Sequence, residues 1–473
     1  MTTLQQSFDY LESLYHRPIL PPEQVGLRRI EYLLGRLGNP ESSFRAIHVT
    51  GTCGKGSTTT MIGCILRASG YRTGVFRSPH LESYLERLEI DGEMVGESEW
   101  CALFDEVKPL AEAMESGQAP GYEAGGRPSL FEFVWAMAAL FFARQSIDVG
   151  AIEVGVGGRL SPTNVLHPEV AVLTNVSLDH TKLLGATERE IGREKAHIIK
   201  SGSQATTAAR HPEVLEEIRR RCQSVEAPLW VVGDEVTVDI RRGSFDGEVI
   251  DVRTPVGEYR ELAVPLLGRH QAINAATAVS AIDQFTGSGG RVSRGAVSEG
   301  LASARLPGRF EIVSTDPLII LDCARNSASA RVLRETIDQL LPDRTVVMLG
   351  GVLADKDAAA VAHNLGPRLR AAVVTQPPWA ERTGDPERLA GPLREHVDAV
   401  EVQQDPDAAL SLALSRLTED DVLLVTGSLY LVAAIRKRLL KPEREASLAA
   451  RVPAAMTGSP PGLPGLTADR PQV

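Results

Sequence analysis

Short runs of β-branched and apolar residues alternate with amphipathic stretches along most of the chain. In the first half, the apolar runs at 46–50, 149–154 and 170–176 predict buried strands. Apolar positions at helical spacing predict helices over 57–69 and 270–285, while 257–267 has a less regular pattern. A second series of strands is predicted at 318–321, 345–349, 371–375 and 422–426, with helical patterns between them. This alternation predicts an α/β fold, with parallel sheets covered by helices.

Changes in composition divide the chain into segments. A polar, glycine-rich break spans 285–293, and the second strand series begins after Arg305-Leu306-Pro307-Gly308. We therefore predict a larger domain over 1–304 and a smaller Rossmann-like α/β domain over 305–440. From 441 to 473 the periodicity is lost and Ala, Pro and Gly dominate, which predicts a disordered tail.

Composition and charge narrow the class of protein. A chain of 473 residues is too long for a single hydrophobic core, and 43% hydrophobic with 23% charged residues is typical of a globular protein. The net charge of −11 argues against nucleic acid and anionic membranes as partners. The five cysteines have neither metal-site nor disulfide spacing, and neither an export signal nor an apolar run of membrane-spanning length is present. We expect a cytoplasmic protein that acts as a monomer.

The strongest chemical signal lies between the first predicted strand and its helix. Three glycines allow the backbone to curl, so that N–H groups and the helix N-terminus point at one place, as a phosphate requires. Lys55 supplies a mobile cation, and the Ser57 hydroxyl suits Mg²⁺. Gly56 separates Lys55 from Ser57, so this is a variant of the usual phosphate loop, and a glycine-rich turn without a ligand is the alternative. The predicted ATP-binding residues here are Gly51, Thr52, Cys53, Gly54, Lys55, Gly56, Ser57 and Thr58.

The loop sequence G-T-x-G-K-G-S-T resembles that of the Mur ligase family. Other segments resemble, in order, the folylpolyglutamate synthase/dihydrofolate synthase branch: 26–40, 78–92, 131–133, 153–160, 178–181, 193–200, 268–275, 306–311 and 426–431. The resemblance implies a P-loop parallel-sheet domain that binds ATP, followed by a smaller ligase domain. It also implies a reaction in which ATP phosphorylates a carboxylate and the amine of L-glutamate attacks the acyl phosphate.

The resemblance assigns roles to residues at the phosphate end of the site. Glu153, Ser78 and His180 would hold Mg²⁺ together with Ser57, and Lys195 would be carbamylated. Each residue taken alone has an ordinary alternative. Glu153 could be a salt-bridged strand end, Ser78 a turn residue and Lys195 part of a solvated helix face, and an isolated histidine such as His180 is more often a surface or hydrogen-bonded residue than a magnesium ligand.

The nucleotide contacts that the resemblance implies come from both predicted domains. Asn274 would contact adenine, Arg309 the γ-phosphate, and Asp322 the ribose or another part of the nucleotide, with Arg325 near the nucleotide. Ordinary capping and hinge polarity are the alternatives. The implied catalytic residues are Lys55, Glu153, His180, Lys195 and Arg309.

Three departures from the family pattern concern the phosphate loop, the nucleotide and the acid substrate, in that order. Cys53 stands where the family usually has Asn, Arg325 where it has His, and Ser161-Pro162 where it has Asp-Ala. The aspartate is associated with the pterin ring, and serine lacks its charge. The implied acid-binding residues are Pro79, His80, Phe131, Glu132, Leu160, Ser161 and Pro162. The substrate would be dihydropteroate, a tetrahydrofolate, or both; a different acid and a catalytically inactive homologue remain as alternatives.

Overall fold

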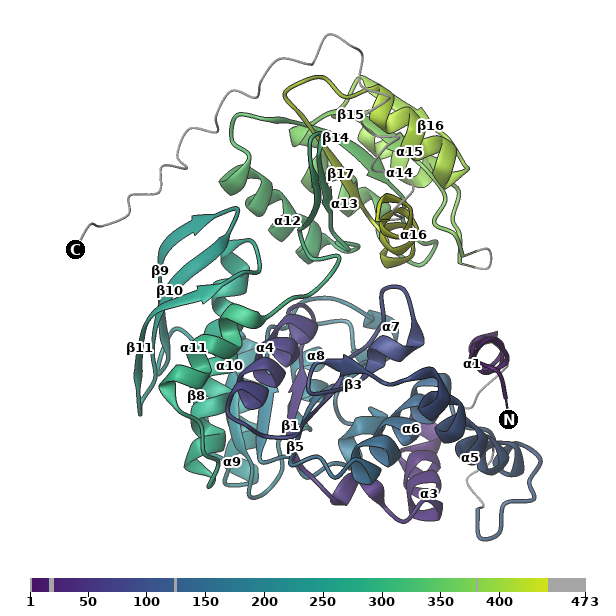
Figure 1. The fold of residues 1–473 in the computed structure, drawn as a ribbon, viewed down its shortest axis with the longest axis vertical. Helices are drawn as coiled ribbons and strands as arrows, with labels where there is room; N and C mark the ends of the chain where they lie inside the picture. Colours follow the sequence, from purple (N-terminus) through teal and green to yellow (C-terminus); the bar gives the residue numbers. More distant parts are fainter. Residues whose placement is uncertain (1, 17–20, 123–125, 380–381, 441–473) are drawn as a thin grey trace.

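The structure is a computed structural model that describes residues 2–16, 21–122, 126–379 and 382–440. The predicted tail at 441–473 lies outside these residues. Three sheets and their helices make up the fold, with the larger part at the bottom of Figure 1 and the C-terminal part at the top. None of the described helices combines the length and apolarity that crossing a membrane requires.

An eight-stranded sheet forms the centre of the larger part. Its strands, in spatial order, are β4 (Glu93–Met94), β3 (Leu88–Ile90), β2 (Thr73–Phe76), β5 (Val149–Glu153), β1 (Arg45–Thr50), β6 (Val170–Leu173), β7 (Gln204–Thr207) and β8 (Leu229–Val231). The pairs from β2 to β8 are parallel, and β3 and β4 add an antiparallel edge.

The helices of the chain surround these sheets. They are α1 (Leu4–His16), α2 (Pro22–Val25), α3 (Arg28–Arg36), α4 (Lys55–Ala68), α5 (Glu97–Glu115), α6 (Leu130–Arg144), α7 (Thr181–Leu184), α8 (Glu188–Ala196), α9 (Pro212–Ser224), α10 (Arg269–Gly287), α11 (Arg294–Ser303), α12 (Ser327–Leu340), α13 (Ala358–Leu365), α14 (Glu387–Leu393), α15 (Pro406–Ser415) and α16 (Leu429–Leu439). Short 3-10 helices lie at Pro40–Ser42, Tyr84–Arg87, Pro162–Val165 and Gly366–Arg368.

The central strands are buried on both faces because helices cover each side. Alternate residues of a strand point to opposite faces. Ala46 of β1 accordingly packs in a core with α3, α5 and α6, whereas its neighbour Ile47 packs in a second core with α4 and α10. Burial on both sides explains the continuous apolar runs that predicted these strands.

A small antiparallel sheet follows the large one in the chain. It contains β9 (Thr237–Ser244), β10 (Gly247–Arg253) and β11 (Glu258–Val264), with β10 in the middle. Only an irregular segment was expected here, at 257–267. Most residues of β9 are exposed, so its sequence lacks the apolar alternation that marks a half-buried strand.

The C-terminal part contains a six-stranded sheet. In spatial order its strands are β12 (Glu311–Thr315), β13 (Leu318–Leu321), β17 (Asp421–Thr426), β14 (Thr345–Gly350), β15 (Leu369–Val374) and β16 (Ala399–Val402). All neighbours are parallel except β12 and β13. The four strands expected from the sequence form its centre, so the α/β prediction is confirmed. The domain boundary at 305 falls between α11 and β12 and stays a prediction.

Candidate active site

The phosphate loop joins β1 to α4. Gly54 is the N-cap of α4 and has φ of 84°, a left-handed conformation that favours glycine. A Cβ atom at Gly51 would lie 1.9 Å from Thr174 Oγ1, so a side chain cannot fit there. The curl that the sequence predicted therefore depends on glycine at both positions.

Residues at the end of β6 hold the loop in place. The Asn175 backbone oxygen accepts from Thr52 N–H at 2.8 Å, and its side-chain Oδ1 accepts from Cys53 N–H at 2.7 Å. Thr174 Oγ1 donates to the Cys53 carbonyl at 2.6 Å. Thr174 and Asn175 were not predicted from the sequence. Their position directly after a buried strand could have indicated that they lie at the same edge of the sheet as the phosphate loop.

Two lysines converge on the carbonyl of Gly51. Lys55 Nζ donates to it at 3.1 Å, and Lys195 Nζ, from α8, donates to it at 2.8 Å. Burial, reinforced by the positive charge of Lys55, lowers the pKa of Lys195 to about 7. The Lys195 amine is therefore largely neutral slightly above neutral pH, which a solvated helix face would not produce.

Glu153 is a buried carboxylate at the end of β5. Its Oε2 accepts a hydrogen bond from Ser78 N–H at 3.0 Å. A Cβ atom on Gly56 would lie 3.7 Å from the same oxygen, so Glu153 adjoins the phosphate loop. Burial raises the pKa of Glu153, and the positive charges of Lys55 and Arg309 oppose that rise. A buried carboxylate in this position is stabilised by any additional cation.

Three of the four predicted Mg²⁺ ligands, Ser57, Ser78 and Glu153, fit such a cation by their chemistry, whereas His180 offers nitrogen. Ser57 and Ser78 offer hydroxyl oxygens and line the same cavity as Glu153. Mg²⁺ prefers oxygen and commonly binds one or two carboxylates plus phosphates and water. Across the described ranges, no group of three or more His, Cys, Asp or Glu side chains forms an all-protein metal cage. That finding is compatible with a magnesium ion shared with ATP.

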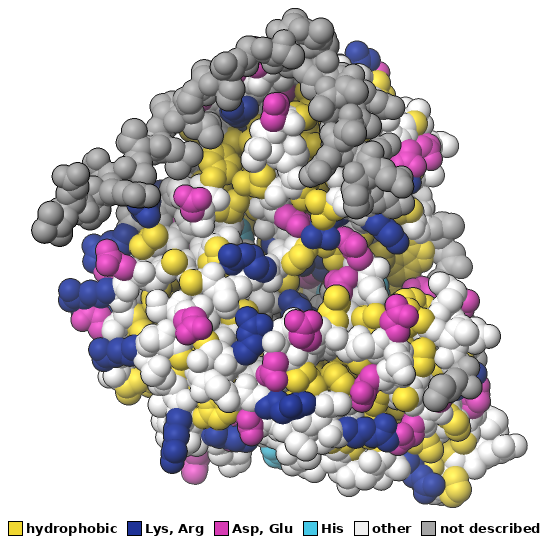
Figure 2. All heavy atoms as spheres, in the orientation of Figure 1, with side chains coloured by type: hydrophobic (Ala, Val, Ile, Leu, Met, Phe, Trp, Pro, Cys, Tyr) yellow, Lys and Arg dark blue, Asp and Glu magenta, His cyan; other side chains and the backbone are white. Residues whose placement is uncertain are grey.

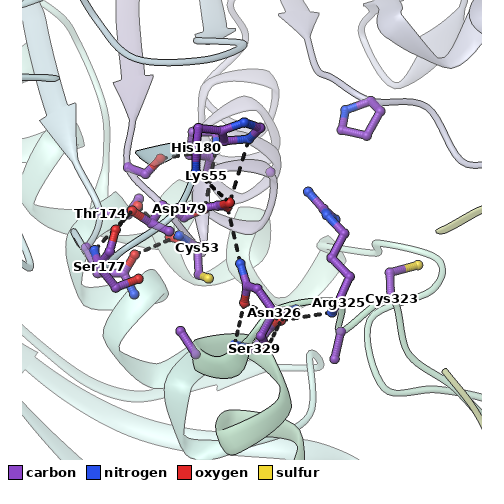
Figure 3. A pocket seen from close by; sticks show the side chains of 18 of the residues that line it. Cys53, Lys55, Thr174, Ser177, Asp179, His180, Cys323, Arg325, Asn326 and Ser329 are labelled. Carbon is purple, nitrogen blue, oxygen red and sulfur yellow. Dashed lines mark hydrogen bonds and ion pairs between the residues drawn. The ribbon is translucent and has the colours of Figure 1, made fainter. Parts of the chain in front are cut away.

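His180 lies where the two parts of the chain meet. It has φ of 50°, and its N–H donates to Asp179 Oδ1 at 2.9 Å. The other oxygen of Asp179 accepts from Asn326 Nδ2 at 3.2 Å, so this aspartate lies between His180 and the C-terminal part (Figure 3). Burial lowers the pKa of His180, which favours its neutral form.

Asp322 organises the C-terminal wall of the site. Its Oδ2 accepts from Phe310 N–H at 2.9 Å and its Oδ1 from Ala324 N–H at 2.8 Å. Phe310 and Ala324 are the immediate neighbours of Arg309 and Arg325, so one carboxylate fixes the two segments that carry these guanidinium groups. Both oxygens of Asp322 thus already bind backbone, and its contact with the nucleotide stays a prediction.

A cavity of about 1170 Å³ separates the two parts. In the space-filling view a hollow lies where they meet, with basic and acidic side chains around it (Figure 2). The predicted residues that line the cavity are Gly51, Thr52, Cys53, Gly54, Lys55, Gly56, Ser57, Ser78, Pro79, Phe131, Glu153, His180, Lys195, Asn274, Arg309, Asp322 and Arg325.

Comparison with known proteins identifies the family. The Mur ligase middle domain matches residues 134–282, and the Mur ligase glutamate ligase domain matches residues 308–429. A dihydrofolate synthase/folylpolyglutamate synthase of Bacillus subtilis is 34% identical over 421 residues, which cover 88% of this chain and 95% of that protein. The chain belongs to the folylpolyglutamate synthase/dihydrofolate synthase family of Mur ligases. It is an ATP-dependent ligase.

Solved structures of relatives agree with this assignment. The Escherichia coli FolC structure in complex with DHPP and ADP has a TM-score of 0.81 and 32% identity, and the match covers 93% of this chain and 98% of that one. The bifunctional Yersinia pestis enzyme complexed with AMPPNP and Mn has a TM-score of 0.79 and 30% identity, with the same coverage. Both belong to the family whose motifs the sequence carries.

Some of the ligase's predicted site residues do not line the cavity. These are Thr58, His80, Glu132, Leu160, Ser161 and Pro162. Thr58 is buried within α4. Glu132 forms a buried ion pair with Arg29 at 3.1 Å and accepts from Ser129 N–H at 2.7 Å as part of the cap of α6. Glu132 therefore has structural contacts in this structure, and its direct contact with the acid stays a prediction.

Ser161 has a buried hydroxyl that contacts Thr163, and the residue does not line the cavity. Its Oγ lies 3.0 Å from Thr163 Oγ1, which in turn lies 2.9 Å from Nε2 of the buried His48. Burial, together with the charge of Lys200, lowers the pKa of His48 to about 3, so this chain of contacts is neutral. The direct substrate contacts expected for residues 160–162 therefore stay predictions without support from this geometry.

Other cavity residues were not predicted. They include Tyr15, Arg87, Lys356, Arg382 and Tyr430. Arg87 and Tyr430 lie inside segments that carried the family resemblance, which was a usable signal. The other three lie in irregular segments or near a helix end, where sequence patterns give no indication of what the side chain faces.

Proposed function

We propose that this ligase uses ATP to join L-glutamate to a folate-type carboxylic acid, dihydropteroate or a tetrahydrofolate or both. The acid's carboxylate oxygen attacks the γ-phosphorus of ATP, and the bond to ADP breaks. The amine of L-glutamate then attacks the acyl carbon, loses a proton, and phosphate leaves from the tetrahedral intermediate. The observation that carries this proposal is the cavity, which has a phosphate loop on one wall and Arg309 and Arg325 on the other.

The residues of the cavity suit the charges in this reaction. Backbone N–H groups of the loop and the N-terminus of α4 would hold the phosphates, with Lys55 moving from its carbonyl partners to the outer phosphate. Arg309 would approach the γ-phosphate and Arg325 the nucleotide, and Asn274 the adenine. Since these groups come from both parts of the chain, closure would assemble the site around bound ATP.

A magnesium ion would be held by Ser57, Ser78, Glu153 and His180. It would supply positive charge that offsets the phosphates during transfer. Lys195 would be carbamylated: its neutral amine attacks CO₂, forms an N–C bond and loses a proton, giving an anion beside the loop. The lowered pKa of Lys195 supports this modification.

A second candidate is the same ligase chemistry on a different acid. The specific observation in its favour is that Ser161 turns toward Thr163 and leaves residues 160–162 outside the cavity lining. Pro79 and Phe131 do line the cavity and would contact either acid.

We further propose that the ligase works in the cytoplasm as a monomer. One chain supplies both walls of the cavity, and every cysteine in the described residues is free of disulfides. Light scattering of the purified protein tests the monomer, because a dimer would double the measured mass.

The decisive assay offers the protein Mg-ATP and L-glutamate with dihydropteroate, a tetrahydrofolate or other carboxylic acids in turn. We expect ADP and a product heavier by one glutamyl group with a pterin acid. Lys55→Ala should abolish turnover, while Lys108→Ala, on the far helix α5, should not change it. Turnover with another acid alone would favour the second candidate, and a fully active Lys55→Ala variant would refute the proposal.

A further inference from the structure

Arg87 is a buried guanidinium on the wall of the cavity. The residue is 7% exposed and lines the cavity. Its Nε donates to Nδ1 of His80 at 3.0 Å. Among the described residues, the two terminal nitrogens have no hydrogen-bond or ion-pair partner. A buried arginine normally has a carboxylate partner, so these N–H groups are available to a ligand in the cavity.

The carboxylates near Arg87 are engaged elsewhere. Glu86 accepts hydrogen bonds from three backbone N–H groups, those of residues 81 to 83. Glu12 accepts from Tyr84 O–H at 2.7 Å, and Glu153 accepts from Ser78 N–H. Glu12 and Glu153 act on the charge of Arg87 from a distance, but no acidic side chain in the described part of the chain forms an ion pair with its guanidinium.

His80 and Tyr84 fix the orientation of the guanidinium. The Tyr84 ring lies 5.1 Å from the guanidinium carbon, and the rings of His80 and Tyr84 have centroids 4.3 Å apart. Because Arg87 donates to Nδ1, that nitrogen must carry no hydrogen, and the Nε2–H tautomer is selected. His80 does not line the cavity itself. It can therefore affect a ligand only through Arg87.

We propose that His80 is a positioning residue, which holds Arg87 so that its two terminal nitrogens receive a substrate carboxylate in a two-point contact. The fork of N–H groups on guanidinium matches a carboxylate in this way only when its plane is fixed. The inference rests on the proposed ligase function, in which both the acid and L-glutamate carry carboxylates. It assigns His80 a supporting role in place of the direct substrate contact that the sequence resemblance implied.

The test compares two replacements of His80. His80→Leu removes the acceptor, whereas His80→Asn retains one, because an amide oxygen occupies a position close to that of Nδ1. We expect His80→Leu to raise KM for one carboxylate substrate about tenfold, with little change in kcat or in KM for ATP. His80→Asn should restore most of the loss. Separate titrations of L-glutamate and of the acid show which carboxylate Arg87 receives, and either result supports the proposal.

A double-mutant cycle separates positioning from a general structural effect. In an Arg87→Ala background, His80→Leu should add no further loss, because the residue through which it acts is already gone. His80→Phe, which keeps a ring against Tyr84, serves if the leucine variant does not fold. Unchanged KM values in these variants, no rescue by asparagine, or additive losses in the double variant would each overturn the inference. The wild-type protein is assayed in parallel. If it joins glutamate to the acid, a contrary result in the variants overturns only the role of His80, whereas a wild-type protein without turnover contradicts the proposed function itself.

Discussion

Gly54 offers a direct test of how the phosphate loop depends on close packing with α10. A Cβ atom at this position would lie 2.4 Å from Asn274 Oδ1, whereas ordinary contact begins at 3.4 Å. Asn274 would therefore have to retreat by the difference between these distances, about 1 Å. Its side chain is buried and donates to Gln271 Oε1 at 2.9 Å, so this retreat disturbs a formed hydrogen bond.

Gly70 provides a matched control at the other end of α4. Both glycines have φ of 84°, but a Cβ atom at Gly70 would meet nothing within 4 Å. Each replacement by alanine should cost about 1–2 kcal/mol for the left-handed backbone conformation. Gly54→Ala should cost roughly a further 1–3 kcal/mol from crowding against Asn274.

The functional difference between the two variants should be larger than the difference in stability. A displacement of about 1 Å in a group that positions a reactant can cost on the order of 100-fold in rate. We expect kcat/KM for ATP to fall about 10- to 100-fold in Gly54→Ala and to stay near the wild-type value in Gly70→Ala. Urea unfolding gives the stabilities, and a coupled ADP assay gives the kinetics. If the two variants match in both measurements, contact with Asn274 does not shape the loop.

Two further predictions concern buried charges. Glu132→Gln should lower the free energy of unfolding by about 2–3 kcal/mol, because the buried ion pair between Glu132 and Arg29 is lost. Unchanged stability with a raised KM for the acid, measured by urea unfolding and kinetics, would instead make Glu132 a substrate residue. The pKa of Lys195 is lowered to about 7, so its neutral, carbamylation-competent amine predominates above that pH and its protonated form below it. A ¹³C-carbamate NMR signal under labelled CO₂ should therefore grow between pH 6 and 8 and be absent from Lys195→Arg, and a wild-type spectrum without it would remove the carbamate.

The sequence predicted the central strands and the phosphate loop because both are local in origin. The strand expected at 318–321 is β13 (Leu318–Leu321), and β1 and β14 each differ from expectation by one residue. Strands buried on both faces carry continuous apolar runs. A phosphate loop is recognisable because its glycines lie directly between a strand and the start of a helix. The exposed strand β9 has neither property and was not predicted.

The acid-binding residues were harder to predict. A motif does not distinguish a residue that contacts the ligand from a residue that only holds such a contacting residue in place. Glu132 pairs with Arg29, which lies 103 positions away, and Asn175 holds Cys53 across 122 positions. His80 and Arg87 lie in the same resembling segment, yet only Arg87 lines the cavity. Such assignments depend on contacts between residues far apart in the chain, and a short motif does not reveal those contacts.

The bridge from Asp179 to Asn326 has a consequence for the catalytic cycle. It joins the two walls beside the phosphate loop, so any movement that separates the two parts must break this contact, and any closure must form it again. A closed arrangement held by this contact would reduce the access of bulk water to an acyl phosphate, an intermediate that hydrolysis would waste. We expect one small polar contact to influence both how quickly products escape and how faithfully each ATP is coupled to a new amide bond.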